Sequence, residues 1–154
     1  MKPSPKKHGP LFSAAGMIGT SAMQLQHEAM PASIRRQAAK VQRWADEAID
    51  GLMPAFSETS VRKMSKHGAT FAQLCAKAGL IRTGQTEQAT VVAARLMAGH
   101  YAANDSVVKL RLKGPWRNLD KTAGTLLAKL VDAMPEYEER MFRVAEEMEM
   151  EMRG

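Results

Sequence analysis

Apolar residues recur at helical spacing along most of this chain, and residues 119–134 show the pattern most clearly. Seven apolar side chains there follow the template i, i+4, i+7, i+8, i+11, i+12, i+15: Leu119, Ala123, Leu126, Leu127, Leu130, Val131 and Met134. A second run has steps of 4, 3, 4, 3 and 4: Ile34, Ala38, Val41, Ala45, Ala48 and Leu52. Each run forms one stripe along an α-helix, which is buried against other helices. The two stripes predict a helical bundle.

Further helices are expected over 13–30, 62–67, 70–78, 86–104 and 136–152. Ser33 and Asn118 are suited to cap helix starts, Gly79 is suited to end a helix, and Pro135 breaks the pattern. β-branched residues are sparse, which argues against a large sheet. The 154-residue chain is therefore expected to hold a single all-α domain over 11–154, a bundle of five to seven helices.

Residues 107–113 alternate in polarity, unlike the rest of the chain. Val108, Leu110 and Leu112 alternate with Lys109, Arg111 and Lys113. No second good strand is available to pair with this segment. Three interpretations stay open: a short extended basic segment, a hairpin with a poor partner, or a last helical turn before Gly114-Pro115.

The first ten residues, MKPSPKKHGP, are rich in proline and lysine and predict a flexible basic arm. The weakly apolar run after them is interrupted by small polar residues and glycines, which makes it a poor signal peptide. No stretch approaches the roughly 18–20 apolar residues needed to span a bilayer. The single cysteine, Cys75, fits a reducing compartment, so a cytoplasmic protein without membrane association is expected.

Charge is distributed unevenly. Residues 1–121 carry 18 Lys/Arg against 8 Asp/Glu, whereas residues 122–154 carry 4 against 8, and together they give the net charge of +6. A basic body with an acidic C-terminal helix favours a polyanionic partner. Many small soluble proteins are basic without binding nucleic acid, and this remains the plain alternative.

The polar face of the 34–52 helix begins with bases, Arg35, Arg36, Lys40 and Arg43, and ends with acids. This order opposes the helix macrodipole, at a cost of about 0.3–1 kcal/mol for each charge. Arginines at a helix start add to the attraction that its free N–H groups exert on phosphate. The face is either a phosphate-binding surface or a solvated face screened by salt.

We therefore predict a small, non-catalytic protein that binds DNA or RNA mainly through phosphate contacts. The candidate contact residues are the cations of this helix and of the flanking segments: Arg35, Arg36, Lys40, Arg43, Arg62, Lys63, Lys66, Arg82, Lys109, Arg111, Lys113 and Arg117. Trp116 beside Arg117 is either a base-stacking surface or, as we favour, a plug that closes the core.

The run FAQLCAKAGL (71–80) resembles the second helix and turn of a helix-turn-helix. Leu74, Cys75 and Gly79 occupy its apolar, small and glycine places. The resemblance implies that a recognition helix follows, opened by Arg82, Thr83, Gln85 and Gln88, whose side chains suit purine edges.

The following helix departs from that motif, because Gln85 and Gln88 stand where apolar residues are needed. Its apolar set begins later and comprises Ala89, Val92, Leu96 and Gly99. A helical hairpin within a bundle produces the same pattern, and the late apolar face favours it.

The segment AGLIRTGQTEQATVVAARL (78–96) is faintly similar to the small helical subunits of CRISPR-type RNA-guided effector complexes. That similarity implies an alternative function, as a protein-interaction subunit of a larger nucleoprotein complex. The Met-rich acidic helix 136–152 suggests another, a scaffold or inhibitor that binds a protein through this helix. The alternative is that its methionine stripe packs in the hydrophobic core. A homo-oligomer is compatible with both the core and the protein-binding interpretation.

Catalytic and metal-binding patterns are lacking in the sequence. The four histidines are scattered without ligand spacing, and no glycine-rich phosphate loop is present. Cys75 falls on a helix face expected to be buried, where a thiol is usually inert. We therefore expect no enzyme activity, no cofactor and no metal.

Overall fold

The computed structural model describes residues 5–27, 30–52, 58–80 and 85–153. Its elements are α1 (Pro5–Gln24), α2 (Ala32–Leu52), α3 (Glu58–Lys77), α4 (Gln85–Leu110), α5 (Pro115–Ala133), the 3₁₀ helix η2 (Pro135–Tyr137) and α6 (Glu138–Arg153). Over these residues the chain has six α-helices and no strand, which confirms the predicted all-α bundle.

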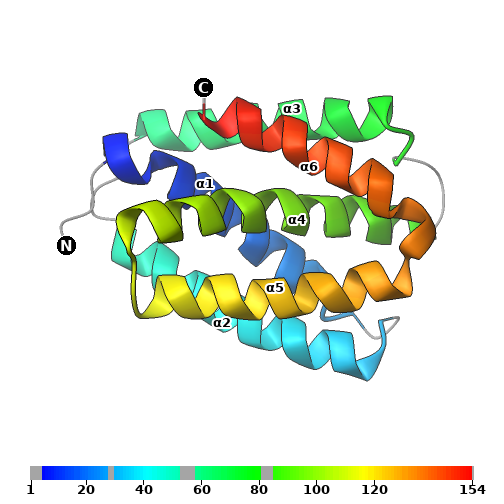
Figure 1. Cartoon of the computed structure of the whole chain (residues 1–154). Helices are drawn as coiled ribbons and strands as arrows, with labels where there is room; N and C mark the ends of the chain where they lie inside the picture. Colours follow the sequence, from blue (N-terminus) through cyan, green and yellow to red (C-terminus); the bar gives the residue numbers. More distant parts are fainter. Residues whose placement is uncertain (1–4, 28–29, 53–57, 81–84, 154) are drawn as a thin grey trace.

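The helices form two layers of three (Figure 1). One layer contains α6, α4 and α5, and the other contains α3, α1 and α2. Across the layers, α3 packs on α6, α1 on α4 and α2 on α5. Helices α2 and α5 thus form one edge of the bundle, and α3 and α6 form the opposite edge.

The centre of the bundle is the close crossing of α1 and α4. A Cβ atom added to Gly99 would lie 2.9 Å from the carbonyl oxygen of Ala14 and 2.9 Å from Cγ1 of Ile18. Small residues on both helices, including Ala14, Ala94 and Ala98, are fully buried there. The two backbones approach so closely because glycine and alanine leave no side chain between them.

Several predicted helix ends are correct. Gly79 has a φ of 75°, the N–H of Leu80 donates to the Cys75 carbonyl at 2.9 Å, and that of Gly79 donates to Ala76 at 3.1 Å. This is a Schellman motif, which ends α3 where the glycine predicted an end. Helix α5 ends at Ala133 and Pro135 begins η2, so the chain breaks at this proline as predicted.

Other boundaries differ from the prediction. Helix α3 runs without interruption through Gly68, so the helices expected at 62–67 and 70–78 are one. The stretch 5–10 of the expected basic arm belongs to α1, and residues 1–4 lie outside the described residues. Ser33 and Asn118 lie inside helices that begin at Ala32 and Pro115, so neither is the cap.

The alternating segment 107–113 is mainly helical rather than extended, because α4 continues to Leu110. A second Schellman motif ends it: Arg111 has a φ of 51°, and the N–H of Leu112 donates to the Val107 carbonyl at 3.0 Å. Val107 and Leu112 are buried in a small cluster with Leu11 and Phe12. The alternation therefore reflects a helix end that returns one apolar residue to the core.

Candidate nucleic-acid interface

Helices α2 and α5 pack side by side in antiparallel directions, and two side-chain contacts record their register. Nε2 of Gln37 donates to the carbonyl oxygen of Thr122 at 3.0 Å. Nζ of Lys129 donates to Oγ of Ser33 at 2.7 Å. The beginning of α2 therefore lies beside the last turns of α5.

Cations from both helices lie exposed along this edge. With a rise of 1.5 Å per residue, the register places Lys40 and Arg43 level with the first two turns of α5. Arg117 and Lys121 lie in those turns, and the side chains of all four residues are exposed. We call this surface the α2–α5 edge and define it by six cations: Arg36, Lys40, Arg43, Arg117, Lys121 and Lys129.

Few of these charges are neutralised by neighbouring acids. Arg43 pairs with Glu47 across 3.7 Å, but the Arg43 side chain stays 71% exposed, so solvent weakens this pair. Among the described residues, Arg36, Lys40 and Lys121 have no ion-pair partner. Asp46 and Asp50 occupy the last turns of α2, as the sequence order implies. The edge therefore presents a net positive charge over its middle.

The α4–α5 turn carries the next group of cations along the chain. Lys109 pairs with Asp105 across 3.2 Å on the last turns of α4. Arg111 and Lys113 are exposed in the turn itself, and Arg117 follows on α5. These cations thus continue from the α2–α5 edge around one end of the bundle.

The structure does not bring every predicted residue to this surface. Arg62 and Lys66 are exposed on α3, at the opposite edge of the bundle (Figure 1). Arg35 is half-buried, and its Nε has no hydrogen-bond partner within the described residues. The Lys63 side chain and all of Arg82 lie outside the described residues.

Two cations of the edge, Lys121 and Lys129, were not predicted from sequence. Lys121 follows Arg117 by four residues, which places both on one side of α5. That spacing was the available signal. It was missed because the strong apolar stripe of α5 suggested a purely structural helix.

Helix α4 occupies the interior and does not resemble an exposed recognition helix. It packs against α1, α5 and α6, and buried residues lie on several sides of it, among them Ala93, Ala94, Leu96, Met97, Ala98, Ala102 and Ala103. A recognition helix needs one face free to enter the major groove. The described structure therefore favours the helical-hairpin interpretation of residues 70–96.

Trp116 and the methionines of α6 serve mainly as core. Trp116 is half-buried and packs against both hydrophobic clusters, as the plug interpretation predicted. Met141, Met148 and Met152 are buried, whereas Met150 is 66% exposed and Phe142 is 45% exposed. The exposed apolar surface of α6 is thus limited to these two side chains.

A titratable pair lies between α4 and α5, away from the cationic edge. Nδ1 of His100 is 3.5 Å from Oδ1 of Asp120, and Nδ2 of Asn104 donates to Oδ2 of the same carboxylate at 3.0 Å. Burial lowers the pKa of His100, and the Asp120 charge only partly opposes this shift.

Neither a metal-binding cluster nor a membrane span occurs among the described residues. No group of three or more His, Cys, Asp or Glu side chains is arranged to hold a metal ion. None of the described helices is both long enough and apolar enough to cross a membrane.

Comparisons with known proteins add no relationship: no protein family matches the chain, and no curated protein or solved structure is significantly similar to it.

Proposed function

We propose that this protein binds nucleic acid, DNA or RNA, through phosphate contacts made by the α2–α5 edge. The observation that carries the proposal is that the α2–α5 register places Lys40 and Lys121 at about the same level on neighbouring helices. Each is exposed, each lacks an ion-pair partner among the described residues, and each belongs to a helix whose register is fixed by the Gln37–Thr122 hydrogen bond. Cations held at fixed places on rigid helices suit a phosphate backbone, which carries charge at regular intervals.

The chemistry of the edge favours phosphate over base recognition. Four of its cations, Arg36, Lys40, Arg117 and Lys121, are exposed, whereas Lys129 is half-buried and Arg43 pairs with Glu47. The two tryptophans near it, Trp44 and Trp116, are half-buried in the core and offer little surface for base stacking. Binding through such a surface depends strongly on salt and weakly on sequence.

The acidic helix α6 lies at the opposite edge, with α3 (Figure 1). This separation keeps the six glutamates of α6 away from the proposed contact surface. We place the activity in the cytoplasm, because a single buried thiol, Cys75, fits a reducing compartment.

The experiment is a fluorescence-anisotropy titration of the purified chain with labelled duplex and single-stranded oligonucleotides. If six phosphates are contacted, we expect affinity to fall by about 10³-fold for duplex and about 300-fold for single strands between about 50 mM and about 200 mM salt. The absence of binding at about 50 mM salt would refute the proposal.

A second candidate is a subunit of a larger nucleoprotein complex, in which the same edge lies along a nucleic acid held mainly by other proteins. The exposed Phe142 and Met150 on α6 favour it, because large apolar side chains on a helix surface are typical of protein contacts. An autonomous binder retains nucleic acid when purified alone. A subunit binds nucleic acid weakly when alone and co-purifies with partner proteins. The double variant Phe142→Gln/Met150→Gln should then lose these partner proteins.

A further inference from the structure

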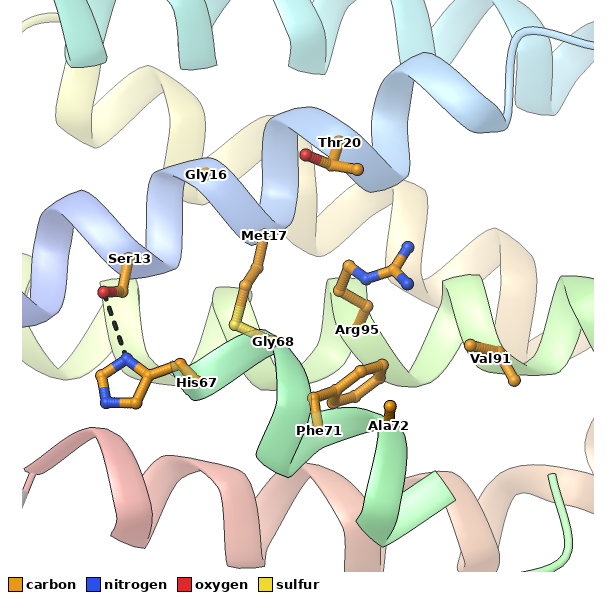
Figure 2. A pocket seen from close by; sticks show the side chains of 10 residues that line it. All are labelled: Ser13, Gly16, Met17, Thr20, His67, Gly68, Phe71, Ala72, Val91 and Arg95. Carbon is orange, nitrogen blue, oxygen red and sulfur yellow. Dashed lines mark hydrogen bonds between the residues drawn. The ribbon is translucent and has the colours of Figure 1, made fainter. Parts of the chain in front are cut away.

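A pocket opens between α1 and α3, with α4 as its floor (Figure 2). Its volume is about 410 Å³, which lies within the range of small-molecule sites. The room arises because small residues, Gly16 on α1 and Gly68 and Ala72 on α3, face it. Met17, Phe71 and Val91 supply further apolar wall, and Ser13, Thr20 and His67 add polar groups, so the lining is mainly but not wholly apolar.

Arg95 brings a positive charge into this apolar pocket. It emerges from α4 between the buried residues Ala94 and Leu96 and projects into the space between α1 and α3 (Figure 2). Its Nη1 donates to Oε1 of Gln24 at 2.8 Å, and its Cζ lies 5.3 Å from the centroid of the Phe71 ring. A guanidinium has five N–H donors, so most of its hydrogen-bonding capacity remains for a ligand.

The charge of Arg95 has no carboxylate partner among the described residues. Cys75 is an electrostatic neighbour, but only a thiolate would neutralise it. Burial raises the pKa of the Cys75 thiol to about 11, so this side chain is neutral at pH 7. A half-buried, uncompensated guanidinium is costly, and an anionic ligand removes that cost.

We propose that this pocket binds a small apolar carboxylate, with Arg95 holding the carboxylate and Phe71, Met17 and Val91 covering the apolar tail. The planar guanidinium matches a carboxylate in two parallel hydrogen bonds. A phosphate dianion fits less well, because Arg95 is the only arginine or lysine among the described lining residues and most of the lining is apolar. The site is separate from the α2–α5 edge and does not depend on nucleic-acid binding.

Calorimetry with the full chain tests this proposal, using octanoate, 1-octanol and octylamine as probes with matched tails. We expect octanoate to bind at one site, octanol more weakly, and octylamine weakest. Arg95→Met keeps the aliphatic stem without the charge. It should lower the affinity for octanoate by about tenfold or more and leave the affinity for octanol unchanged. Equal affinity for the three probes, or no binding of octanoate, would overturn the proposal.

Gly68 provides a second, independent pair of variants. A Cβ atom at Gly68 meets nothing within 4 Å, so larger side chains are accepted without a backbone clash. Gly68→Leu should fill the pocket and abolish octanoate binding, whereas Gly68→Ala should leave it within about twofold of the wild type. Retention of octanoate binding by a folded Gly68→Leu protein would place the ligand elsewhere and contradict the proposal.

Discussion

Gln37 of α2 and Thr122 of α5 are joined by a hydrogen bond of 3.0 Å between the Gln37 amide and the Thr122 carbonyl, across 85 positions of sequence. Together with the Lys129–Ser33 contact, this bond sets the register of the two helices that carry the proposed binding surface. Helices α2 and α5 are also joined by apolar packing. The hydrogen bond therefore contributes more to their register than to the stability of their association.

Replacing Gln37 by alanine should lower the free energy of unfolding by about 0.5–1.5 kcal/mol, since one partly buried hydrogen bond is lost. Urea denaturation followed by circular dichroism measures this change. The exposed Gln73→Ala on α3 is the control and should differ from the wild type by less than about 0.5 kcal/mol. Equal effects of the two variants would show that the Gln37–Thr122 bond contributes nothing.

Gly99→Ala should destabilise the fold by about 1–3 kcal/mol or more, because the added methyl group would overlap the Ala14 carbonyl and Ile18 at 2.9 Å. Gly68→Ala should instead stabilise it by up to about 1 kcal/mol, since alanine is the better helix former and its Cβ meets nothing within 4 Å. Thermal unfolding compares the two variants. A neutral Gly99→Ala would mean that α1 and α4 do not cross this closely.

His100 should make stability depend on pH. Because burial lowers its pKa in the folded state below the ordinary 6.5, the unfolded chain binds the proton more tightly. The free energy of unfolding should therefore fall as pH drops from 6.5 towards the lowered folded pKa. His100→Gln should flatten the curve in this window, and an unchanged curve would remove His100 as the cause.

Cys75 should react only when the bundle opens. The side chain is fully buried, and burial raises the pKa of its thiol to about 11, so little thiolate is present or accessible at pH 8. Alkylation by iodoacetamide, followed by mass spectrometry, should accelerate sharply in urea at the unfolding midpoint. Fast modification without denaturant would contradict the placement of Cys75 in the core.

The helices of this fold were predictable because their apolar residues repeat at the helical period. The stripe from Leu119 to Met134 and the glycine stop at Gly79 both appear as expected. The end of α4 was left open among three interpretations, of which the last helical turn is correct, because a Schellman motif with Arg111 at positive φ imitates the alternation of a strand. Gly68 likewise suggested a break between the helices expected at 62–67 and 70–78. Helix α3 packs on α6 and stays helical through Gly68.

The candidate site was only partly accessible from sequence. The cations of α2 were found because they crowd one helical face, yet nothing local shows that α5, and not α3, lies beside them. That proximity comes from the long-range Gln37–Thr122 and Ser33–Lys129 contacts. Arg95 was overlooked because it stands alone among the apolar residues of 91–99, and its pocket exists only where α1, α3 and α4 meet.

The most direct test of the central claim is the salt dependence of oligonucleotide binding in two matched double variants. Lys40→Gln/Lys121→Gln removes one lysine from each helix of the α2–α5 edge. Lys66→Gln/Lys77→Gln removes two exposed lysines from α3, at the opposite edge, and leaves the same net charge.

We predict that Lys40→Gln/Lys121→Gln weakens oligonucleotide binding. It should also reduce the slope of log K against log salt by about 1.4 for single strands and about 1.8 for duplex DNA. The α3 variant should stay close to the wild type in both affinity and slope. Equal losses in the two variants would mean that net charge, and not the α2–α5 edge, drives binding, and would contradict the account.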